Sequence, residues 1–275
     1  MMRAGVRRCL RLPALVVLLF GGLFTVLVLF PFSTQALRRA TIRQWSRMLV
    51  AVCGVSPQAV QVPGARSLAE LPAGSLVVAN HISWLDIFVI NAQCPCGFVA
   101  KDEIRRWPLI GTLVARTGTL FIERGKRHAV HRMIEHIERR LQAGGRVAVF
   151  PEGTTSSGAQ LLPFHANLIE GAVRAGAPIV PVGLHYRDPD GGRSTAIEFI
   201  GETTFLQSIW RITGAPQQHC EVSTLSGILP EGMTRHEIAQ RARHELATQL
   251  ALPLDDSMPE TLRAVLAIKR ASEVR

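Results

Sequence analysis

The sequence predicts an α/β domain with a mixed, largely parallel central sheet flanked by helices, preceded by an N-terminal membrane-associated helical segment. From residue 75 onward, short apolar runs rich in β-branched residues alternate with longer runs of helical periodicity, a pattern typical of a buried, mostly parallel sheet. Before that point the chain holds an uncharged apolar run of about the length that a helix needs to cross a bilayer.

The apolar run extends from Leu12 to Phe32. A cleavable signal peptide is the alternative, because Thr34 and Ala36 form a weak small-residue cleavage site. The run is longer than the usual signal-peptide core of about 7–15 residues, however, and more arginines follow it. We therefore expect a retained anchor. A glycine pair in its middle and a proline near its end also allow a bent or shallow insertion.

Residues 36–52 predict a second helix, which is amphipathic. At 100° per residue its apolar side chains, with Trp45 among them, gather on one face, and Arg39, Arg43 and Arg47 stack on the other. A cationic helix of this kind fits one that lies in the plane of the lipid headgroups. The alternative is an ordinary amphipathic helix packed on the domain.

Positive charge is concentrated at the N-terminus. The first fifty residues hold eight arginines and no acidic residue, whereas the rest of the chain carries 23 basic and 21 acidic side chains. Because this basic segment encloses an apolar one, it indicates anionic membrane lipids as partners and no nucleic acid. The five cysteines are scattered and odd in number, which favours a reducing, cytosolic environment without a disulfide framework. Their spacing predicts no metal site.

We expect four segments along the chain. These are the anchor and basic helix (1–54), a linker rich in Pro and Gly (55–74), the main domain (75–252) and a peripheral tail (253–275). Strands are expected at 75–79, 97–100, 119–123, 146–150, 178–186 and 195–200. Helices are expected at 84–92, 108–117, 127–143 and 166–176, and from a capping box at Thr234 to Leu250.

The stretch NHISWLD, residues 80–86, places His81 and Asp86 five positions apart where an apolar strand ends. In a regular helix these side chains would point about 140° apart, so they meet only if His81 precedes the helix and Asp86 lies in its first turn. A carboxylate that holds one imidazole nitrogen leaves the other free to accept a proton, as a general base does. The alternative is a capping turn in which Asp86 complements the helix dipole.

The stretch GTLFIER ends an apolar strand with Arg124, whose guanidinium can clamp an anion. The alternative is a solvated loop charge paired with Glu123. The stretch FPEGTT, residues 150–155, forces a turn whose amides and hydroxyls could cradle a phosphate or an oxyanion. Its alternative is a β-turn with Glu152 in a structural hydrogen bond. The stretch PIVPV, residues 178–182, alone predicts an apolar strand.

In this order and at these separations, NHISWLD, GTLFIER, FPEGTT and PIVPV resemble the four sequence blocks of the lysophospholipid acyltransferase family, typified by 1-acyl-glycerol-3-phosphate acyltransferase. The resemblance spans about residues 75–185 and implies a glycerolphosphate acyltransferase-like fold. It also implies that His81 removes the proton of a lysolipid hydroxyl and that Asp86 orients His81. The residues implied for binding the acceptor's phosphate region are Arg124, Glu152, Gly153 and Thr154. Those implied for the acyl or acceptor pocket are Phe121, Pro178, Ile179, Val180, Pro181 and Val182.

The resemblance implies no cofactor and no metal, only an acyl thioester of acyl carrier protein or coenzyme A as co-substrate. The acceptor expected first is 1-acyl-sn-glycerol-3-phosphate, giving phosphatidic acid in phospholipid biosynthesis, at the cytoplasmic (inner) membrane with the catalytic domain on the cytosolic side. Another lysolipid, such as lyso-ornithine lipid, is an alternative acceptor. The family often carries a lysine where this chain has His165, a weaker, pH-dependent cation, so the headgroup preference stays open.

Two functions outside this class remain as alternatives. A lipid ester or thioester hydrolase would use the same His81 and Asp86 to activate water, although the sequence contains no G-x-S-x-G nucleophile elbow. A non-catalytic membrane adaptor would use only the basic N-terminal anchor.

Overall fold

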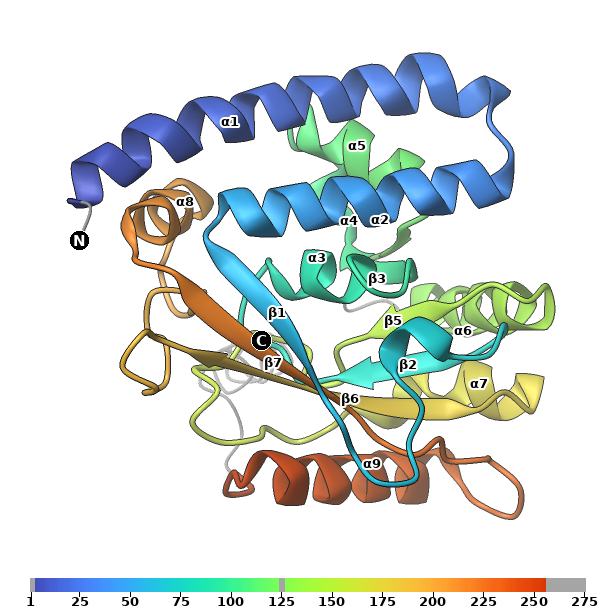
Figure 1. Cartoon of the computed structure of the whole chain (residues 1–275). Coiled ribbons are helices and arrows are strands. Elements are labelled where there is room, and N and C mark those ends of the chain that lie inside the picture. The colour runs from blue at the N-terminus through green and yellow to red at the C-terminus, as the bar shows by residue number, and fades with distance from the viewer. Residues whose placement is uncertain (1–2, 124–126, 256–275) are drawn as a thin grey trace, which may run out of the picture.

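A computed structural model describes residues 3–123 and 127–255, in which seven strands form one sheet of order β1-β7-β6-β2-β5-β3-β4 (Figure 1). The strands are β1 (Val55–Val60), β2 (Leu76–Ala79), β3 (Gly97–Lys101), β4 (Leu120–Ile122), β5 (Val147–Val149), β6 (Ile179–Arg187) and β7 (Gln218–Thr224). Among these seven described strands, only β6 and β7 pair antiparallel. The prediction of a mixed, largely parallel sheet is confirmed.

Helices cover both faces of the sheet. They are α1 (Ala4–Phe24), α2 (Gln35–Val52), α3 (Asp86–Asn91), α4 (Asp102–Arg105), α5 (Ile110–Arg116), α6 (Arg127–Gln142), α7 (Glu170–Ala175), α8 (Phe205–Gly214) and α9 (Arg235–Leu250). Strand β2 shows how the layers are sorted, because Val77 and Ala79 enter the core under α2, α3 and α8, whereas Leu76 and Val78 enter the core under α6, α7 and α9. Burial on both faces explains why the central strands are continuous apolar runs.

The N-terminal segment folds back on itself as a hairpin of α1 and α2 that lies along one side of the domain (Figure 1). Helix α1 continues through a π-helical turn (Thr25–Leu29) and a 3-10 turn (Phe30–Phe32). The whole stretch Ala4–Phe32 is long and apolar enough to cross a membrane, by length and composition, and 17% of its most apolar window is buried. Trp45 of α2 donates from its indole nitrogen to the carbonyl of Leu18, which joins the two helices.

Arginines tie this hairpin to the domain. Arg7 Nε donates to Gly214 O at 2.7 Å and Arg11 Nη1 to Ala215 O at 2.7 Å, both at the C-terminal end of α8. Cations are favourable at this end of a helix, where carbonyls lack intrahelical partners. In α2, Val50 is buried and Arg47 donates to the carbonyl of Ala92. The helix predicted at 36–52 therefore packs on the domain, which was the alternative to a location in the headgroup plane.

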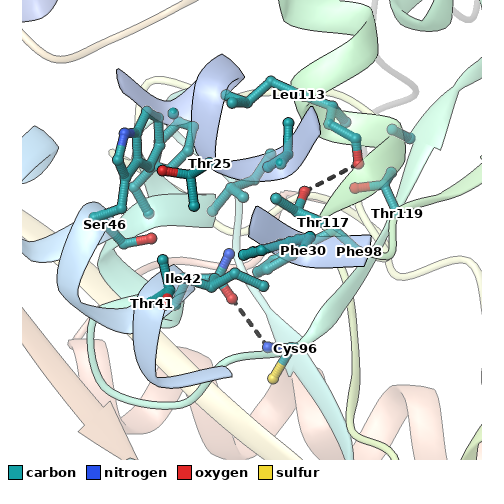
Figure 2. Close-up of a pocket in the computed structure, with 18 of the residues that line it drawn as sticks. Thr25, Phe30, Thr41, Ile42, Ser46, Cys96, Phe98, Leu113, Thr117 and Thr119 are labelled. Atoms are coloured by element: carbon teal, nitrogen blue, oxygen red, sulfur yellow. Dashed lines mark hydrogen bonds between the residues drawn. The ribbon is translucent and has the colours of Figure 1, made fainter. Parts of the chain in front are cut away.

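A narrow apolar pocket lies between the hairpin and the domain (Figure 2). Its wall is formed by Gly22 of α1 and by side chains of the turns after α1, of α2 and of the domain elements α3, β3 and α5. Its apolar lining includes Val26, Phe30, Ile42, Phe88, Phe98 and Leu113. The N-terminal segment therefore forms part of the wall of this pocket.

Two expectations for secondary structure are wrong. The linker expected at 55–74 begins with β1, which pairs in parallel with β7 at the edge of the sheet. Its proline and its exposed Gln58 made this edge strand look like a connection. The strand expected at 195–200 is an irregular segment, because Ile197 is buried but Phe199 N–H donates to Ile82 O outside any ladder. Helix α8 and strand β7 were not expected at all.

Candidate active site

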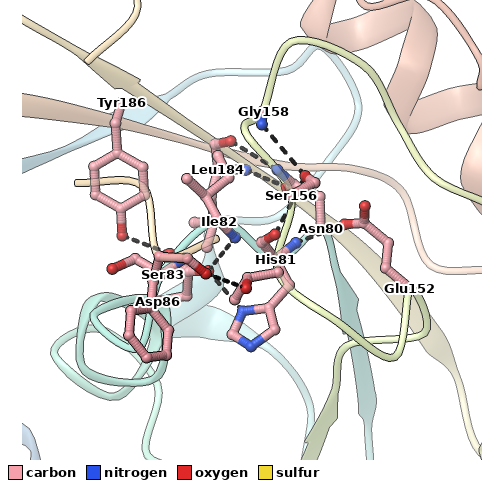
Figure 3. Close-up of polar contacts among 12 residues, drawn as sticks. Asn80, His81, Ile82, Ser83, Asp86, Glu152, Ser156, Gly158, Leu184 and Tyr186 are labelled. Atoms are coloured by element: carbon pink, nitrogen blue, oxygen red, sulfur yellow. Dashed lines mark hydrogen bonds and ion pairs between the residues drawn. The ribbon is translucent and has the colours of Figure 1, made fainter. Parts of the chain in front are cut away.

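His81 and Asp86 meet at the end of β2 (Figure 3). The strand ends at Ala79 and α3 begins at Asp86, so His81 lies on the turn between them. His81 Nδ1 is 2.8 Å from Asp86 Oδ2. Asp86 is fully buried, whereas 18% of the His81 side chain is exposed. The geometric prediction that these two side chains meet across a strand-to-helix break is confirmed.

Four donors converge on the Asp86 carboxylate. Besides His81, the backbone N–H groups of Ile82 and Ser83 donate to Oδ2 at 2.7 and 2.9 Å. The hydroxyl of Tyr186 donates to Oδ1 at 2.7 Å. Hydrogen bonds to both oxygens fix the plane of a buried carboxylate. Asp86 is therefore a rigid acceptor for the Nδ1 proton of His81.

The imidazole of His81 also packs against an aromatic ring. Its ring stacks on Phe150, with the centroids 3.9 Å apart and the planes 8° from parallel. With the Nδ1 proton directed at Asp86, the lone pair is on Nε2. Within the described part of the chain, Nε2 makes no hydrogen bond. This arrangement makes Nε2 available as a general base.

The turn after β5 braces the backbone around His81 (Figure 3). The Glu152 carboxyl accepts from His81 N–H at 2.7 Å and from Leu162 N–H at 3.2 Å. Ser156 N–H donates to His81 O at 2.7 Å. Burial raises the pKa of Glu152 to about 8, with the two backbone donors partly opposing it. Glu152 thus makes the structural hydrogen bonds considered as an alternative, and its predicted contact with an acceptor stays a prediction.

The other residues predicted to bind the acceptor lie nearby or outside the described chain. Gly153 has a φ of +72°, a left-handed conformation that glycine adopts without strain. Thr154 follows it and is half-buried. Exposed His165 lies beside Gly153, since a Cβ on that glycine would come within 3.3 Å of the imidazole. Arg124 lies outside the described residues.

The residues predicted for the acyl or acceptor pocket lie on strand β4, just before strand β6 and on β6 itself. Phe121 is half-buried on β4, with the Arg105 guanidinium 5.8 Å from its ring. Pro178 lies just before β6, and residues 179–182 form its start, where Val180 and Val182 pack into the central core. None of these residues lines the apolar pocket beneath the hairpin. Their assignment to a substrate pocket stays a prediction.

Aromatic contacts connect that pocket with His81. Phe98 lines the pocket, and its ring stacks on Phe150 with the centroids 5.8 Å apart. Phe150 in turn stacks on His81. An apolar wall therefore runs from the pocket to the candidate base.

Sequence reasoning missed two polar residues of the site. Asn80 donates to Leu184 O at 2.9 Å and accepts from Leu184 N–H at 2.8 Å, so its amide extends the pairing of β2 with β6 past the end of β2. Tyr186 reaches Asp86 from the far end of β6. The available signal for Tyr186 was the period-two pattern that places it on the same face of β6 as Val182.

Comparisons with known proteins find similar chains among acyltransferases. A family model described as Acyltransferase matches residues 60–185. The chain is 35% identical to the lyso-ornithine lipid O-acyltransferase of Pseudomonas aeruginosa over 230 residues, which cover 83% of this chain and 84% of that protein. It is 37% identical to the 1-acyl-sn-glycerol-3-phosphate acyltransferase of Neisseria gonorrhoeae over 202 residues, 74% of this chain and 73% of that protein.

The fold is also similar to a solved structure. The crystal structure of the 1-acyl-sn-glycerophosphate acyltransferase from Thermotoga maritima matches with a TM-score of 0.64, at 21% sequence identity, over 89% of this chain and 96% of that chain. At this identity the likeness concerns the fold. The Pseudomonas relative, matched over most of both chains, establishes the relationship. The chain belongs to the acyltransferase family of enzymes.

Proposed function

We propose that the protein transfers a fatty acyl group from a thioester donor to the free hydroxyl of a lysophospholipid, with His81 as the general base. The observation that carries this proposal is the 2.8 Å contact between His81 Nδ1 and a buried Asp86, with Nε2 left without a hydrogen bond in the described residues. The names of the relatives support the acceptor class.

The reaction follows from this geometry. Nε2 of His81 accepts the proton of the lysolipid hydroxyl while Asp86 stabilises the resulting imidazolium. The oxygen forms a bond to the thioester carbonyl carbon, and the tetrahedral intermediate then expels the thiolate. The imidazolium returns its proton to that thiolate, so the products are the acylated lipid and a free thiol. Neither a covalent acyl-enzyme nor an added cofactor enters this sequence of steps.

The apolar pocket beneath the hairpin offers a location for an acyl chain. Its lining is almost wholly apolar, and the rings of Phe98 and Phe150 continue it toward His81. An acyl chain in this pocket would be shielded from water, and its thioester end would approach the candidate base. The acceptor's charged headgroup would then lie over the FPEGTT turn, beside His165.

We propose lysophosphatidate as the acceptor, from the four sequence blocks and from relatives that act on 1-acyl-sn-glycerol-3-phosphate. Lyso-ornithine lipid is the second candidate, because several relatives carry that name, including one matched over more than four fifths of this chain. The donor is proposed to be an acyl thioester of acyl carrier protein or coenzyme A. We place the enzyme at the cytoplasmic membrane, with the catalytic domain on the cytosolic side.

The test is thiol release from acyl-coenzyme A and from acyl-carrier protein by purified protein in mixed micelles. Each donor is offered with lysophosphatidate, with lyso-ornithine lipid or with no acceptor. Release that requires one lysolipid supports acyl transfer and identifies the acceptor, whereas equal release without acceptor would make the protein a thioesterase.

Two variants accompany this assay. His81→Ala is expected to lose at least about 10²-fold in kcat, the lower end of general-base contributions. The control His236→Ala removes an exposed imidazole on α9 and is expected to behave as wild type. Activity of His81→Ala within a few-fold of wild type would contradict the proposed base.

A further inference from the structure

Asp86 uses both of its carboxylate oxygens, and only one of them serves His81. Oδ2 accepts from His81 Nδ1 at 2.8 Å, whereas Oδ1 accepts from the phenol of Tyr186 at 2.7 Å. Asp86 and Tyr186 are 0% and 1% exposed. A buried hydroxyl needs a hydrogen-bond partner within the protein, and for Tyr186 that partner is the carboxylate that orients the base.

We propose that Tyr186 is a positioning residue, which fixes the Asp86 carboxylate for His81 and thereby sets the pH at which His81 becomes an active base. This inference rests on the proposed role of His81. With Oδ1 held by β6 and Oδ2 held by the backbone of the His81 loop, the carboxylate cannot rotate without breaking a hydrogen bond.

Electrostatics gives the direction of the effect. A phenol that donates to Oδ1 takes up part of the carboxylate charge, so Asp86 attracts the Nδ1 proton of His81 less strongly. Without the hydroxyl of Tyr186, the full negative charge of Asp86 would remain on its two carboxylate oxygens. The imidazolium of His81 would then be better stabilised, and His81 would lose its proton at a higher pH. The loosened carboxylate would also hold the ring less firmly.

In the described parts of the chain, four titratable groups from separate elements surround the carboxylate. They are His81 before α3, Glu152 after β5, Tyr186 on β6 and Cys220 on β7. Burial raises the pKa of Tyr186 and that of the Cys220 thiol well above their usual ranges, so both stay neutral near pH 7. His81 and Glu152 are therefore the two groups whose titration must be separated in the experiment.

The first arm of the test is kinetic and uses Tyr186→Phe, which keeps the ring and removes the hydroxyl. We expect kcat to fall about tenfold, a part of the 10²–10⁴-fold that a general base contributes, with KM for both substrates unchanged. The acid limb of the pH profile should move up by roughly half a unit. A purely structural role would lower the thermal midpoint and leave the pH profile in place, and that result would overturn the proposal.

The matched control is Ser208→Ala. Ser208 is fully buried and accepts a 3.0 Å hydrogen bond from Trp84, in the same loop as His81, but among the described residues it makes no hydrogen bond to Asp86. The substitution Ser208→Ala therefore removes a comparable hydrogen bond and leaves the hydrogen bonds of the Asp86 carboxylate in place. We expect its pH profile to coincide with that of wild type. An equal shift in Ser208→Ala and Tyr186→Phe would show a general loosening of the loop and would overturn the proposal.

The second arm needs no turnover. Tyr186 is the only tyrosine in the sequence, so protein grown with tyrosine labelled by ¹³C at the phenol carbon gives a single resonance that requires no assignment. We expect this resonance to shift as His81 titrates, in the Glu152→Gln background that removes the second titrating group. The shift should vanish when His81→Ala is added. A shift that persists without His81, or no shift in either protein, would overturn the proposal.

The two arms keep this inference separate from the proposed function. A tyrosine resonance that follows His81 in a protein without acyl transfer would support the hydrogen-bonded network while the proposed function fails. Acyl transfer with an unshifted pH profile in Tyr186→Phe would leave the proposed function intact and overturn the positioning role.

Discussion

Two carboxyl groups lie on either side of the His81 backbone, and their surroundings differ. Asp86 receives four donors, including the His81 ring, whereas Glu152 receives the backbone N–H groups of His81 and Leu162. Burial raises the pKa of Glu152 to about 8, from an ordinary value near 4.5. Asp86 therefore holds the imidazole of His81, whereas Glu152 holds the backbone of His81.

The raised pKa of Glu152 predicts how stability depends on pH. Between about pH 4.5 and pH 8 the folded protein binds a proton on Glu152 that the unfolded chain releases. This contribution is complete below pH 4.5 and is lost as the pH rises through about 8, with a slope of up to about 1.4 kcal/mol per pH unit. Glu152→Gln cannot titrate. Thermal midpoints in detergent from pH 5 to pH 9 should therefore fall for wild type relative to Glu152→Gln.

In Glu152→Gln, the side-chain NH₂ group replaces one of the two acceptor oxygens. It therefore faces a backbone N–H group, so that two donors oppose each other. That mismatch costs about 1–3 kcal/mol. Because the cost is the same at every pH, it lowers the whole curve of thermal midpoint against pH without changing its slope. The slope is thus the informative quantity. Parallel curves for the two proteins would show that Glu152 does not titrate in this window.

His165 predicts a change in acceptor affinity. It is exposed beside Gly153, at the turn where the acceptor headgroup is proposed to lie. His165→Lys supplies a cation that stays charged at all assay pH values. We expect KM for lysophosphatidate to fall several-fold at pH 8, where histidine is largely neutral, and much less at pH 5.5. The same change for a lysolipid without a phosphate would contradict a phosphate contact.

At this scale the sequence predicts contacts between neighbours along the chain better than contacts across the sheet. His81 and Asp86 are five positions apart, so a strand-to-helix break is enough to bring them together. Tyr186 lies 100 positions beyond Asp86, and Asn80 pairs with Leu184 across 104 positions. Those contacts depend on the register of β2 against β6, which no local pattern specifies.

Elements with strong local signals were predicted close to their observed bounds. Helix α9 begins after the capping box at Thr234 and ends at Leu250, as expected, and α6 ends at Gln142 just before a glycine pair. Strand β7 was missed because it is short and holds only two apolar residues, Cys220 and Val222. Strand β1 was missed because an edge strand tolerates proline and exposed polar side chains.

The arginine contacts between α1 and α8 predict a measurable coupling of hairpin and domain. Arg11 donates to the carbonyls of Ile212, Thr213 and Ala215. Arg11→Leu leaves these carbonyls without that cation, at a cost of about 1–3 kcal/mol. We expect the thermal midpoint in detergent to fall by a few degrees and trypsin to cleave α1 faster. Equal effects from Arg3→Leu, an exposed residue just before α1, would mean that positive charge alone matters.

At the scale of the whole molecule, the sheet and the hairpin are arranged for lipid substrates. The candidate base His81 lies just past the carboxyl end of β2, and the apolar pocket lies between the domain and the hairpin. The hairpin helices therefore face the domain with one side and solvent with the other, and the outer side of α1 is apolar. The sequence predicted both the α/β domain and the apolar segment, but the pocket between them forms only when the hairpin folds back on the domain.

The outer face of α1 predicts where the molecule meets a membrane. It exposes large apolar side chains, and the nearby α8 adds Leu206 and Trp210. Exposed apolar residues on α1 and the turn that follows it include Val16, Val17, Phe20, Phe24, Leu27 and Phe32. Exposed apolar side chains in this number are costly in water and indicate a site of membrane contact. We expect this face to enter the bilayer.

Phe20→Asp tests this with a matched control. Phe20 and Leu229 are both 58% exposed, but Leu229 lies in the connection between β7 and α9. An aspartate within an inserted apolar segment costs about 3 kcal/mol, so Phe20→Asp should lower partitioning into phospholipid vesicles by about tenfold or more, measured by flotation. Leu229→Asp should float as wild type does, because its side chain stays in water whether or not the protein is bound. If Phe20→Asp also floats as wild type does, the outer face of α1 does not enter the bilayer, and the apolar surface must be covered by another partner.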